Sequence, residues 1–202
     1  MIESLKEIYL NNMVNLIYKS TEHDYHLYKT NSVPENLMEF KFHSKQGYAK
    51  YKSIFMEKEE SSTRGYTMYN LFQLTAGSLL FYNLYKDIKF VIFDYLKDKP
   101  ELKYMWFSSW INYHTSSEVL DWHNHRQSVC HGYVSIDPKD TTTEFKKYSI
   151  KNEPGLIYIG PSDTLHRVNV DKQFEGNRIT IGFDVFSDEK SSNLLTGFFP
   201  LA

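Results

Sequence analysis

Near the amino terminus, apolar residues recur at the spacing of one helix face. The pattern predicts an amphipathic helix over roughly residues 1–19 that packs as a flank on a sheet. Its apolar positions are Ile2, Leu5, Ile8, Tyr9, Met13, Leu16 and Ile17. From Thr21 to Thr63 no period stands out, so we expect loops there, with a turn at residues 32–35 and at most one short strand.

A second helical stripe, before residue 100, is clearer. Ser78 is suited to cap the start of a helix, and Lys99-Pro100 to end it. The apolar positions between these two signals are Leu80, Leu84, Ile88, Val91, Ile92 and Tyr95. We expect a helix that turns this face toward the core.

After Pro100 the period changes to two, which indicates strands. Short alternating runs occur at about 104–113, 118–125, 129–136, 143–150, 155–159, 166–170 and 178–186, with turn-forming residues between them. Seven closely spaced strands predict a mainly β (α+β) fold, a sandwich or jelly roll with N-terminal supporting helices. We expect one domain over 1–202, with a helical flank in 1–100, the jelly-roll core in 101–187 and a C-terminal tail in 188–202.

Charge and hydropathy narrow the class of protein. The 202 residues carry 23 Lys and Arg against 25 Asp and Glu, a net charge of -2, unlike the strongly basic proteins that coat DNA. Bases and aromatics alternate over residues 41–52, but acids follow closely at 57, 59 and 60, so we favour a solvated loop over a nucleic-acid surface. No apolar run approaches the roughly 20 residues that span a bilayer, and acids near the amino terminus do not suit a signal peptide. These features predict a soluble, cytoplasmic protein with no membrane partner, and they disfavour nucleic acid as a partner without excluding it.

Two residue types add to this description. The single cysteine, Cys130, excludes an intramolecular disulfide and a multi-cysteine zinc site. The 16 Tyr and 14 Phe suit a β-rich fold, because aromatic side chains pack well on a pleated surface. Exposed aromatic residues could also support a homodimer.

The most informative segment is Asp121-Trp122-His123-Asn124-His125. In a strand, residues i and i+2 point to the same side, so His123 and His125 could hold one metal ion, with Asp121 on that same side. His166 follows a strand and a Gly-Pro turn that would bring it back toward the pair. Two surface histidines are the simpler alternative, but this context favours a metal-binding cup inside a small β-barrel.

A further polar pair lies on the last predicted strand. Strand alternation places Arg178 and Thr180 on one face, with Ile179, Ile181 and Phe183 on the other. A guanidinium group on the inner face of a barrel is costly to bury unless an anion meets it, and a carboxylate is its natural partner. A small acid that binds both the metal and Arg178 would satisfy both features. The alternative is an edge strand with Arg178 in solvent.

Together these motifs resemble the iron(II)- and 2-oxoglutarate-dependent oxygenases of the double-stranded β-helix, or jelly-roll, fold. The resemblance rests on His123-x-His125, on His166 after Gly-Pro-Ser, and on Arg178-x-Thr180 before an apolar strand. More narrowly, the chain is similar to uncharacterised oxygenase-like proteins often encoded in phage genomes, which carry a comparable W-H-x-H segment followed by H-G-Y and H-R-V. The resemblance extends from Trp106 to Val185.

One position departs from the family pattern. The residue two after the first histidine is usually Asp or Glu, which completes a facial triad of two histidines and one carboxylate, but here it is His125. Three explanations remain open. The metal has three histidine ligands, or Asp121 supplies the carboxylate, or His125 faces the substrate while water completes the metal shell.

The resemblance implies the cofactors and their places. Fe(II) would be held by the histidines, and 2-oxoglutarate would chelate it while its distal carboxylate binds Arg178 and Thr180. With O2, the products would be succinate, CO2 and an oxidised substrate that the sequence does not identify; hydroxylation is the commonest outcome, and demethylation or desaturation would use the same motifs.

Neighbouring residues would shape such a cavity. Tyr133 and Asn112 are candidates to contact 2-oxoglutarate, and Trp110 and His131 to line the substrate pocket. Core packing is their alternative role. Cys130 is expected to be inert core. We expect turn or edge roles for the isolated acids Asp163 and Asp184.

Two rival classes stay open. A three-histidine cupin would bind the metal without 2-oxoglutarate, and Gly155 and Pro161 fit the spacing of its second motif. Such an enzyme has no general need for Arg178-x-Thr180. A non-catalytic jelly-roll binding module would have no tight iron site.

Overall fold

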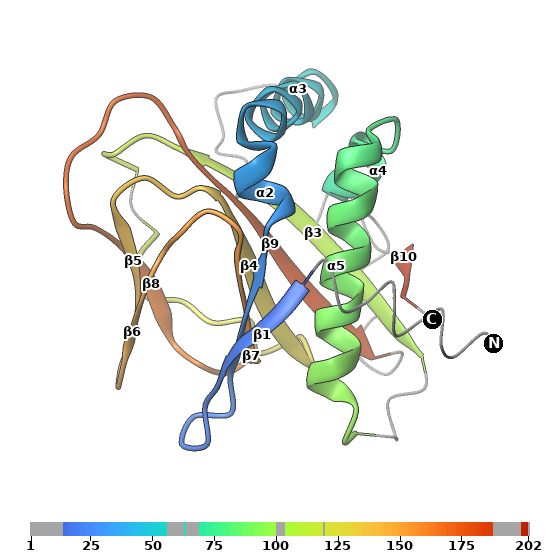
Figure 1. The fold of residues 1–202 in the computed structure, drawn as a ribbon, viewed down its shortest axis with the longest axis vertical. Helices are drawn as coiled ribbons and strands as arrows, with labels where there is room; N and C mark the ends of the chain where they lie inside the picture. Colours follow the sequence, from blue (N-terminus) through green and yellow to red (C-terminus); the bar gives the residue numbers. More distant parts are fainter. Residues whose placement is uncertain are drawn as a thin grey trace.

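The computed structural model of the 202-residue chain describes residues 14–55, 63, 69–99, 104–118, 120–187 and 199–201. Its elements run β1 (Val14–Lys19), β2 (His26–Thr30), α2 (Ser32–Glu35), α3 (Leu37–Phe55), α4 (Leu71–Leu74), α5 (Leu79–Leu96), β3 (Met105–His114), β4 (Cys130–Asp137), β5 (Thr141–Phe145), β6 (Ser149–Lys151), β7 (Leu156–Pro161), β8 (His166–Val170), β9 (Arg178–Ser187) and β10 (Phe199–Pro200). The protein is mainly β, as the sequence predicts (Figure 1).

The strands form two antiparallel sheets. The larger has the order β1-β2-β7-β4-β9-β3-β10 and the smaller the order β6-β5-β8. Helices α3, α4 and α5 pack on one face of the larger sheet, and the smaller sheet lies on its other side (Figure 1). The central strands therefore bury both faces, one under helices and one toward the second sheet. No helix in the described part of the chain is long and apolar enough to cross a membrane.

Strand alternation divides β9 as predicted. Ile179, Ile181 and Phe183 join the core beneath the helices, whereas Arg178 and Thr180 face the space between the sheets. The neighbouring strands β3 and β4 divide in the same way. Each central strand thus contributes one apolar face to the core and one polar face to the interior of the sheet pair.

Helix α5 confirms the predicted stripe and its start. The Ser78 side chain accepts a hydrogen bond from the amide of Phe81 at 3.4 Å, as an N-cap does. The face that includes Leu84, Ile88 and Val91 is fully buried against the sheet. The last helical residue is Leu96, a few residues before the predicted stop.

The amino-terminal prediction is wrong where the structure describes it. Residues Val14–Lys19 form the edge strand β1, paired with β2, rather than the end of a helix. Leu16 and Ile17, which supported the helical period, are about half exposed, at 47% and 54%. Pairing with β2 at the edge of the sheet, and not the helical spacing of apolar residues, determines the structure of this segment. The rest of the predicted helix, residues 1–13, lies outside the described residues.

The solvated loop expected over residues 41–52 is also wrong, because α3 spans this segment. Its buried positions are Phe40, Ser44, Gly47 and Tyr51, which have helical spacing. Two of the four are not apolar, so the stripe is weak in the sequence. Packing at Gly47 is tight, since a Cβ there would lie 3.2 Å from Leu71 Cδ1.

The strand predictions after residue 100 hold with two exceptions. β8 has its predicted bounds, and β3, β4, β7 and β9 differ from theirs by one or two residues at an end. The run at 143–150 divides into β5 and β6 with a turn between them. The segment 120–125 is not a regular strand, and only a single bridge joins His123 to His166.

One buried acid on α5 yields a prediction for stability. Asp87 is 3% exposed, and burial raises the pKa of its carboxyl group to about 6, although Thr30 Oγ1 donates to it at 3.0 Å. A raised pKa in the folded state gives stability that is complete below about pH 4 and lost as the pH rises toward 6. Asp87→Asn is therefore expected to increase the free energy of unfolding by about 1–3 kcal/mol at pH 8, with no gain below pH 4.

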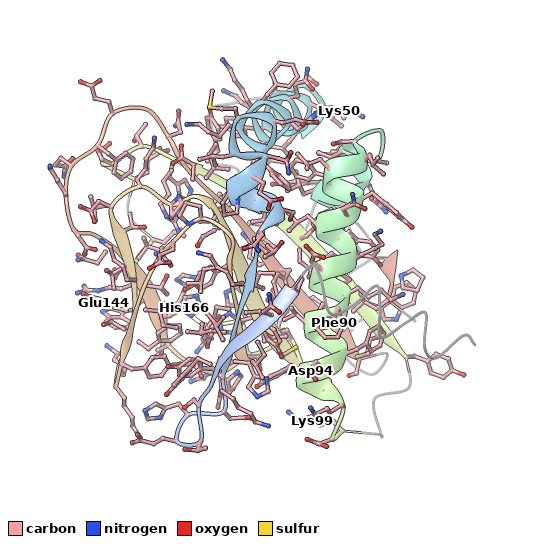
Figure 2. All side chains as sticks on the ribbon, in the orientation of Figure 1. Lys50, Phe90, Asp94, Lys99, Glu144 and His166 are labelled. Atoms are coloured by element: carbon pink, nitrogen blue, oxygen red, sulfur yellow. The ribbon has the colours of Figure 1, made fainter. Side chains whose placement is uncertain are left out.

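Urea denaturation of both proteins across this pH range measures the difference. Asp94 on the same helix, labelled in Figure 2, is the matched control. It accepts from the Tyr28 hydroxyl at 2.7 Å, and this bond and Lys97 outweigh burial and lower its pKa. Asp94→Asn should therefore destabilise the protein at pH 8. A loss of stability in Asp87→Asn at pH 8 would contradict the prediction.

Candidate metal and anion site

A cavity of about 250 Å³ lies between the two sheets. It brings together side chains from β3, β4, β8 and β9 and from the loop before β4. Nine of the residues that the sequence singles out line it: Trp110, Asn112, His123, His125, His131, Tyr133, His166, Arg178 and Thr180. Thr63, Leu120, Asn124, Gly132, Thr143, Val168 and Gly182 complete the wall.

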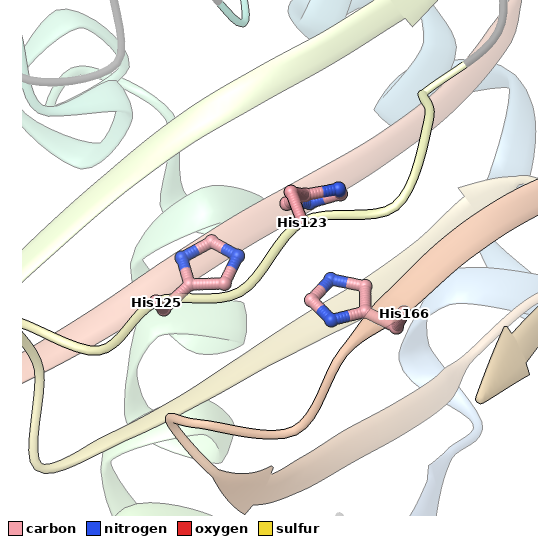
Figure 3. Close-up of side chains that lie close together, drawn as sticks. All are labelled: His123, His125 and His166. Atoms are coloured by element: carbon pink, nitrogen blue, oxygen red, sulfur yellow. The ribbon is translucent and has the colours of Figure 1, made fainter. Parts of the chain in front are cut away.

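Three histidines meet at one end of this cavity. Candidate ligand atoms of His123, His125 and His166 all lie within 4.8 Å of one another. The first two come from the loop that precedes β4, and His166 from the start of β8 (Figure 3). The backbones of His123 and His166 also exchange two N–H···O bonds, each 3.0 Å long. His125 is held separately, since its amide donates to the Ser162 carbonyl at 2.8 Å.

Each of the three rings has an acceptor beside its Nδ1 atom. For His123 it is the main-chain oxygen of Asp121 at 2.6 Å, and for His166 that of Thr164 at 3.1 Å. For His125 it is the carboxylate of Asp184. Because a carbonyl or a carboxylate only accepts, Nδ1 must carry the proton in each neutral ring. Nε2 is then left with its lone pair free for a metal ion.

Burial favours the neutral form of His123 and His166. Burial is the main cause that lowers the pKa of His166 to about 3, and the neighbouring His123 and His125 add to the shift. Burial likewise lowers the pKa of His123, although the Asp121 carbonyl opposes the shift. Neutral imidazole is the form that binds metal. The donor set, its tautomers and its protonation therefore fit a divalent transition metal.

The structure does not bring the alternative ligand Asp121 into this group. Its side chain is exposed, and Oδ1 accepts a hydrogen bond from the amide of Trp122 at 2.7 Å. Asp121 instead contacts His123 through its main-chain oxygen. Asp163 is exposed in a turn, as expected.

A fourth histidine, His131, lies beside the three. Its ring stacks on those of His125 and His166, with centroids 4.7 Å apart in both cases. It is fully buried, and burial holds its pKa well below the usual range. Its Nε2 has no hydrogen-bond partner among the described residues. His131 is therefore a neutral wall of the cavity next to the three ligand candidates.

The other end of the cavity is cationic. Arg178 is 5% exposed, and burial lowers the pKa of its guanidinium group to about 10, so the group stays charged at neutral pH. Among the described residues its Nε has no hydrogen-bond partner, and none of their acids makes an ion pair with it. A buried charge without a counter-ion is costly. The site is thus arranged to receive an anion.

Polar groups next to Arg178 form a connected network. Asn112 Nδ2 donates to Thr180 Oγ1 at 3.2 Å, and Asn112 Oδ1 accepts from Trp110 Nε1 at 3.2 Å and from Thr63 Oγ1 at 2.7 Å. These bonds fix the amide orientation of Asn112. Tyr133 contributes a buried phenol whose pKa burial raises, so it remains a neutral hydroxyl.

Trp110 forms the floor between the two ends. Its indole lies on β9 at Gly182, where an added Cβ would be 2.5 Å from Trp110 Cε2. The same ring stacks on His125 with centroids 5.8 Å apart. Because Gly182 has no side chain, the Trp110 ring can lie against β9 and the cavity stays open.

The sequence interpretation misjudged the acid that supports the site. Asp184 was expected in a turn or at an edge, but it is 3% exposed on β9 and contacts His125. The missed signal is the strand period itself, because Asp184 continues the alternation of Arg178 and Thr180. Cys130 has the expected role, since it is buried in the core below the helices, and burial raises the pKa of its thiol.

Comparison of the whole fold identifies related architectures. The structure is similar to the non-haem alpha-ketoglutarate-dependent carbocyclase SnoK from nogalamycin biosynthesis, with a TM-score of 0.60 and 9% identity over 90% of this chain and 93% of that one. It is also similar to a prolyl-4-hydroxylase from Pseudomonas putida, with a TM-score of 0.53 and 8% identity over 82% of this chain and 88% of that one. No protein-family model matches the sequence, and no curated protein is detectably similar to it. The fold is a double-stranded β-helix, as predicted.

Proposed function

We propose that the protein is a non-haem Fe(II)- and 2-oxoglutarate-dependent dioxygenase. One observation carries the proposal: a single cavity joins three clustered histidines to a buried arginine that has no acidic partner among the described residues. A metal and a dicarboxylate would satisfy the two ends together. The fold shared with SnoK and the prolyl-4-hydroxylase is consistent with this function.

In this proposal His123, His125 and His166 hold Fe(II) through Nε2. Their Nδ1 partners prevent the rings from rotating, so the three nitrogens are oriented before the metal arrives. When bound, Fe(II) and 2-oxoglutarate supply an oxidant derived from O2, with succinate and CO2 as coproducts. The chain's own contribution is to bind, orient and enclose these groups.

Arg178 and Thr180 bind the distal carboxylate of 2-oxoglutarate. The guanidinium group, which is buried in the protein, provides charge-assisted hydrogen bonds. Asn112 and Tyr133 are proposed as further donors around the same anion. A neutral ligand would leave the buried charge of Arg178 without compensation, so the cavity selects for an acid.

The substrate would enter beside Trp110 and His131, whose flat rings bound the metal end of the cavity. Their apolar faces would exclude water from the reacting carbon. Hydroxylation is the proposed outcome.

One observation favours a second candidate, a three-histidine cupin-type metalloenzyme that does not use 2-oxoglutarate. It is the presence of His125 where the resembled oxygenases have a carboxylate. The two candidates differ in whether Arg178 has an anionic ligand. The experiment below separates them.

Anaerobic titration of metal-stripped protein tests the proposal. We expect Fe(II) followed by 2-oxoglutarate to produce a visible charge-transfer band that neither produces alone. 2-Oxovalerate, which lacks the distal carboxylate, is the matched ligand control and should require about 100-fold more ligand for half of the band, because it cannot use Arg178. Iron binding without a band would favour the cupin candidate. Absence of iron binding would leave a jelly-roll binding module.

A further inference from the structure

The three histidines are supported by two kinds of acceptor. His123 and His166 donate from Nδ1 to neutral main-chain carbonyls, whereas His125 faces a carboxylate. Asp184 Oδ1 and Oδ2 lie 2.9 Å and 3.1 Å from His125 Nδ1. The site therefore has one negatively charged support, and it lies behind the histidine that departs from the usual ligand pattern.

Asp184 is not placed there by a surface ion pair. It is 3% exposed in the middle of β9, next to Ser108 on β3 and His131 on β4 in the strand register. Among the described residues the His125 ring faces it, and no lysine or arginine pairs with it. A buried carboxylate is costly without such a partner. The buried position of Asp184 is explained if a positive charge lies at Nε2 of His125, the ring nitrogen that faces away from Asp184.

We propose that Asp184 is a positioning residue that supplies, through the ring of His125, the negative charge that a carboxylate ligand would otherwise bring directly to the metal. This inference rests on the metal site of the proposed function. A carboxylate on Nδ1–H fixes the ring and makes Nε2 a stronger donor. His125 would then be the most electron-rich of the three ligands. Asp184, which lies behind His125 rather than at the metal, would compensate for the carboxylate that is missing from position 125.

The first test compares two isosteric substitutions. Asp184→Asn removes the charge behind His125, whereas Asp121→Asn, the matched control, leaves the main-chain oxygen that supports His123 in place. Co(II), which reports its ligands through visible d–d bands, is the probe. We expect Asp184→Asn to weaken Co(II) binding about 10- to 100-fold and to shift these bands. Asp121→Asn should stay within about twofold of wild type and keep its spectrum.

A second variant separates this role from packing. In His125→Asp two buried carboxylates would lie close together, so Co(II) affinity should fall. Adding Asp184→Asn removes the repulsion and offers an amide donor to the new carboxylate, so the double variant should bind Co(II) more tightly than His125→Asp alone. This non-additivity is the signature of a direct interaction. Additive losses would mean that Asp184 serves packing and would overturn the inference.

The outcomes separate the two proposals. Wild-type affinity and spectrum in Asp184→Asn would overturn the inference alone. If wild-type protein binds Co(II) and Fe(II) but gives no response to 2-oxoglutarate, the dioxygenase proposal fails, while the affinity ratio still decides the role of Asp184. Absence of metal binding in the wild-type protein would overturn both.

Discussion

Arg178→Met is expected to weaken the binding of 2-oxoglutarate to the Fe(II) protein by about 100-fold or more. The guanidinium group is the cationic end of the cavity, and each hydrogen bond to a charged group is worth about 1.5–3 kcal/mol. Two such bonds account for a factor of this size. Methionine fills a similar space without a charge, so the fold should be retained. The charge-transfer band, titrated with 2-oxoglutarate, measures the change.

Two controls make this result specific. Arg167→Met removes a half-exposed arginine that pairs with Glu144 at 2.7 Å, and it should leave the titration unchanged. In Arg178→Met the affinity for 2-oxovalerate should also be unchanged, because that ligand has no distal carboxylate. Equal losses for both 2-oxo acids would show that the substitution disturbs the metal end, contrary to our assignment.

His166→Ala is expected to reduce Fe(II) affinity by about 100- to 1,000-fold. Structural zinc sites gain about 10–16 kcal/mol from four ligands, which suggests about 2.5–4 kcal/mol for one of them. The main-chain bridge to His123 does not depend on the His166 side chain, so the loop should keep its place. Equilibrium dialysis of the metal-stripped protein with Fe(II) under anaerobic conditions measures the loss.

The matched control for this substitution is His43→Ala. His43 lies on α3 and faces Glu39 at 3.7 Å, and it lies outside the cavity wall. Its removal should leave Fe(II) affinity unchanged. If His166→Ala also binds Fe(II) like the wild type, these three histidines are not the metal site.

The fold was predictable where local pattern and tertiary role agree. On β9 Arg178 and Thr180 face the cavity, and the apolar residues that alternate with them face the core, as the sequence pattern predicts. On α5 the apolar stripe is the buried face. Sequence reasoning failed for α3, because Ser44 and Gly47 occupy buried positions and weaken the stripe. It failed for β1 because an edge strand depends on its partner more than on its own period.

The candidate site was predicted better than its local structure. His123 and His125 were placed together by assuming a strand, yet they lie in a loop that is anchored to β8 and to the Ser162 carbonyl. Asp184 was misjudged because its partner, His125, is distant in the sequence. A contact of this kind depends on how strands are brought together, which period and spacing do not specify.

The main-chain bridge between His123 and His166 bears on how a metal ion at the proposed site would exchange. Both hydrogen bonds of the bridge form within the chain itself, so the entropy of ordering the loop is lost on folding rather than on metal binding. A preorganised cup can be emptied by a chelator and refilled without a folding step. Which divalent ion occupies it then depends on the relative supply and affinity of the ions in the surroundings.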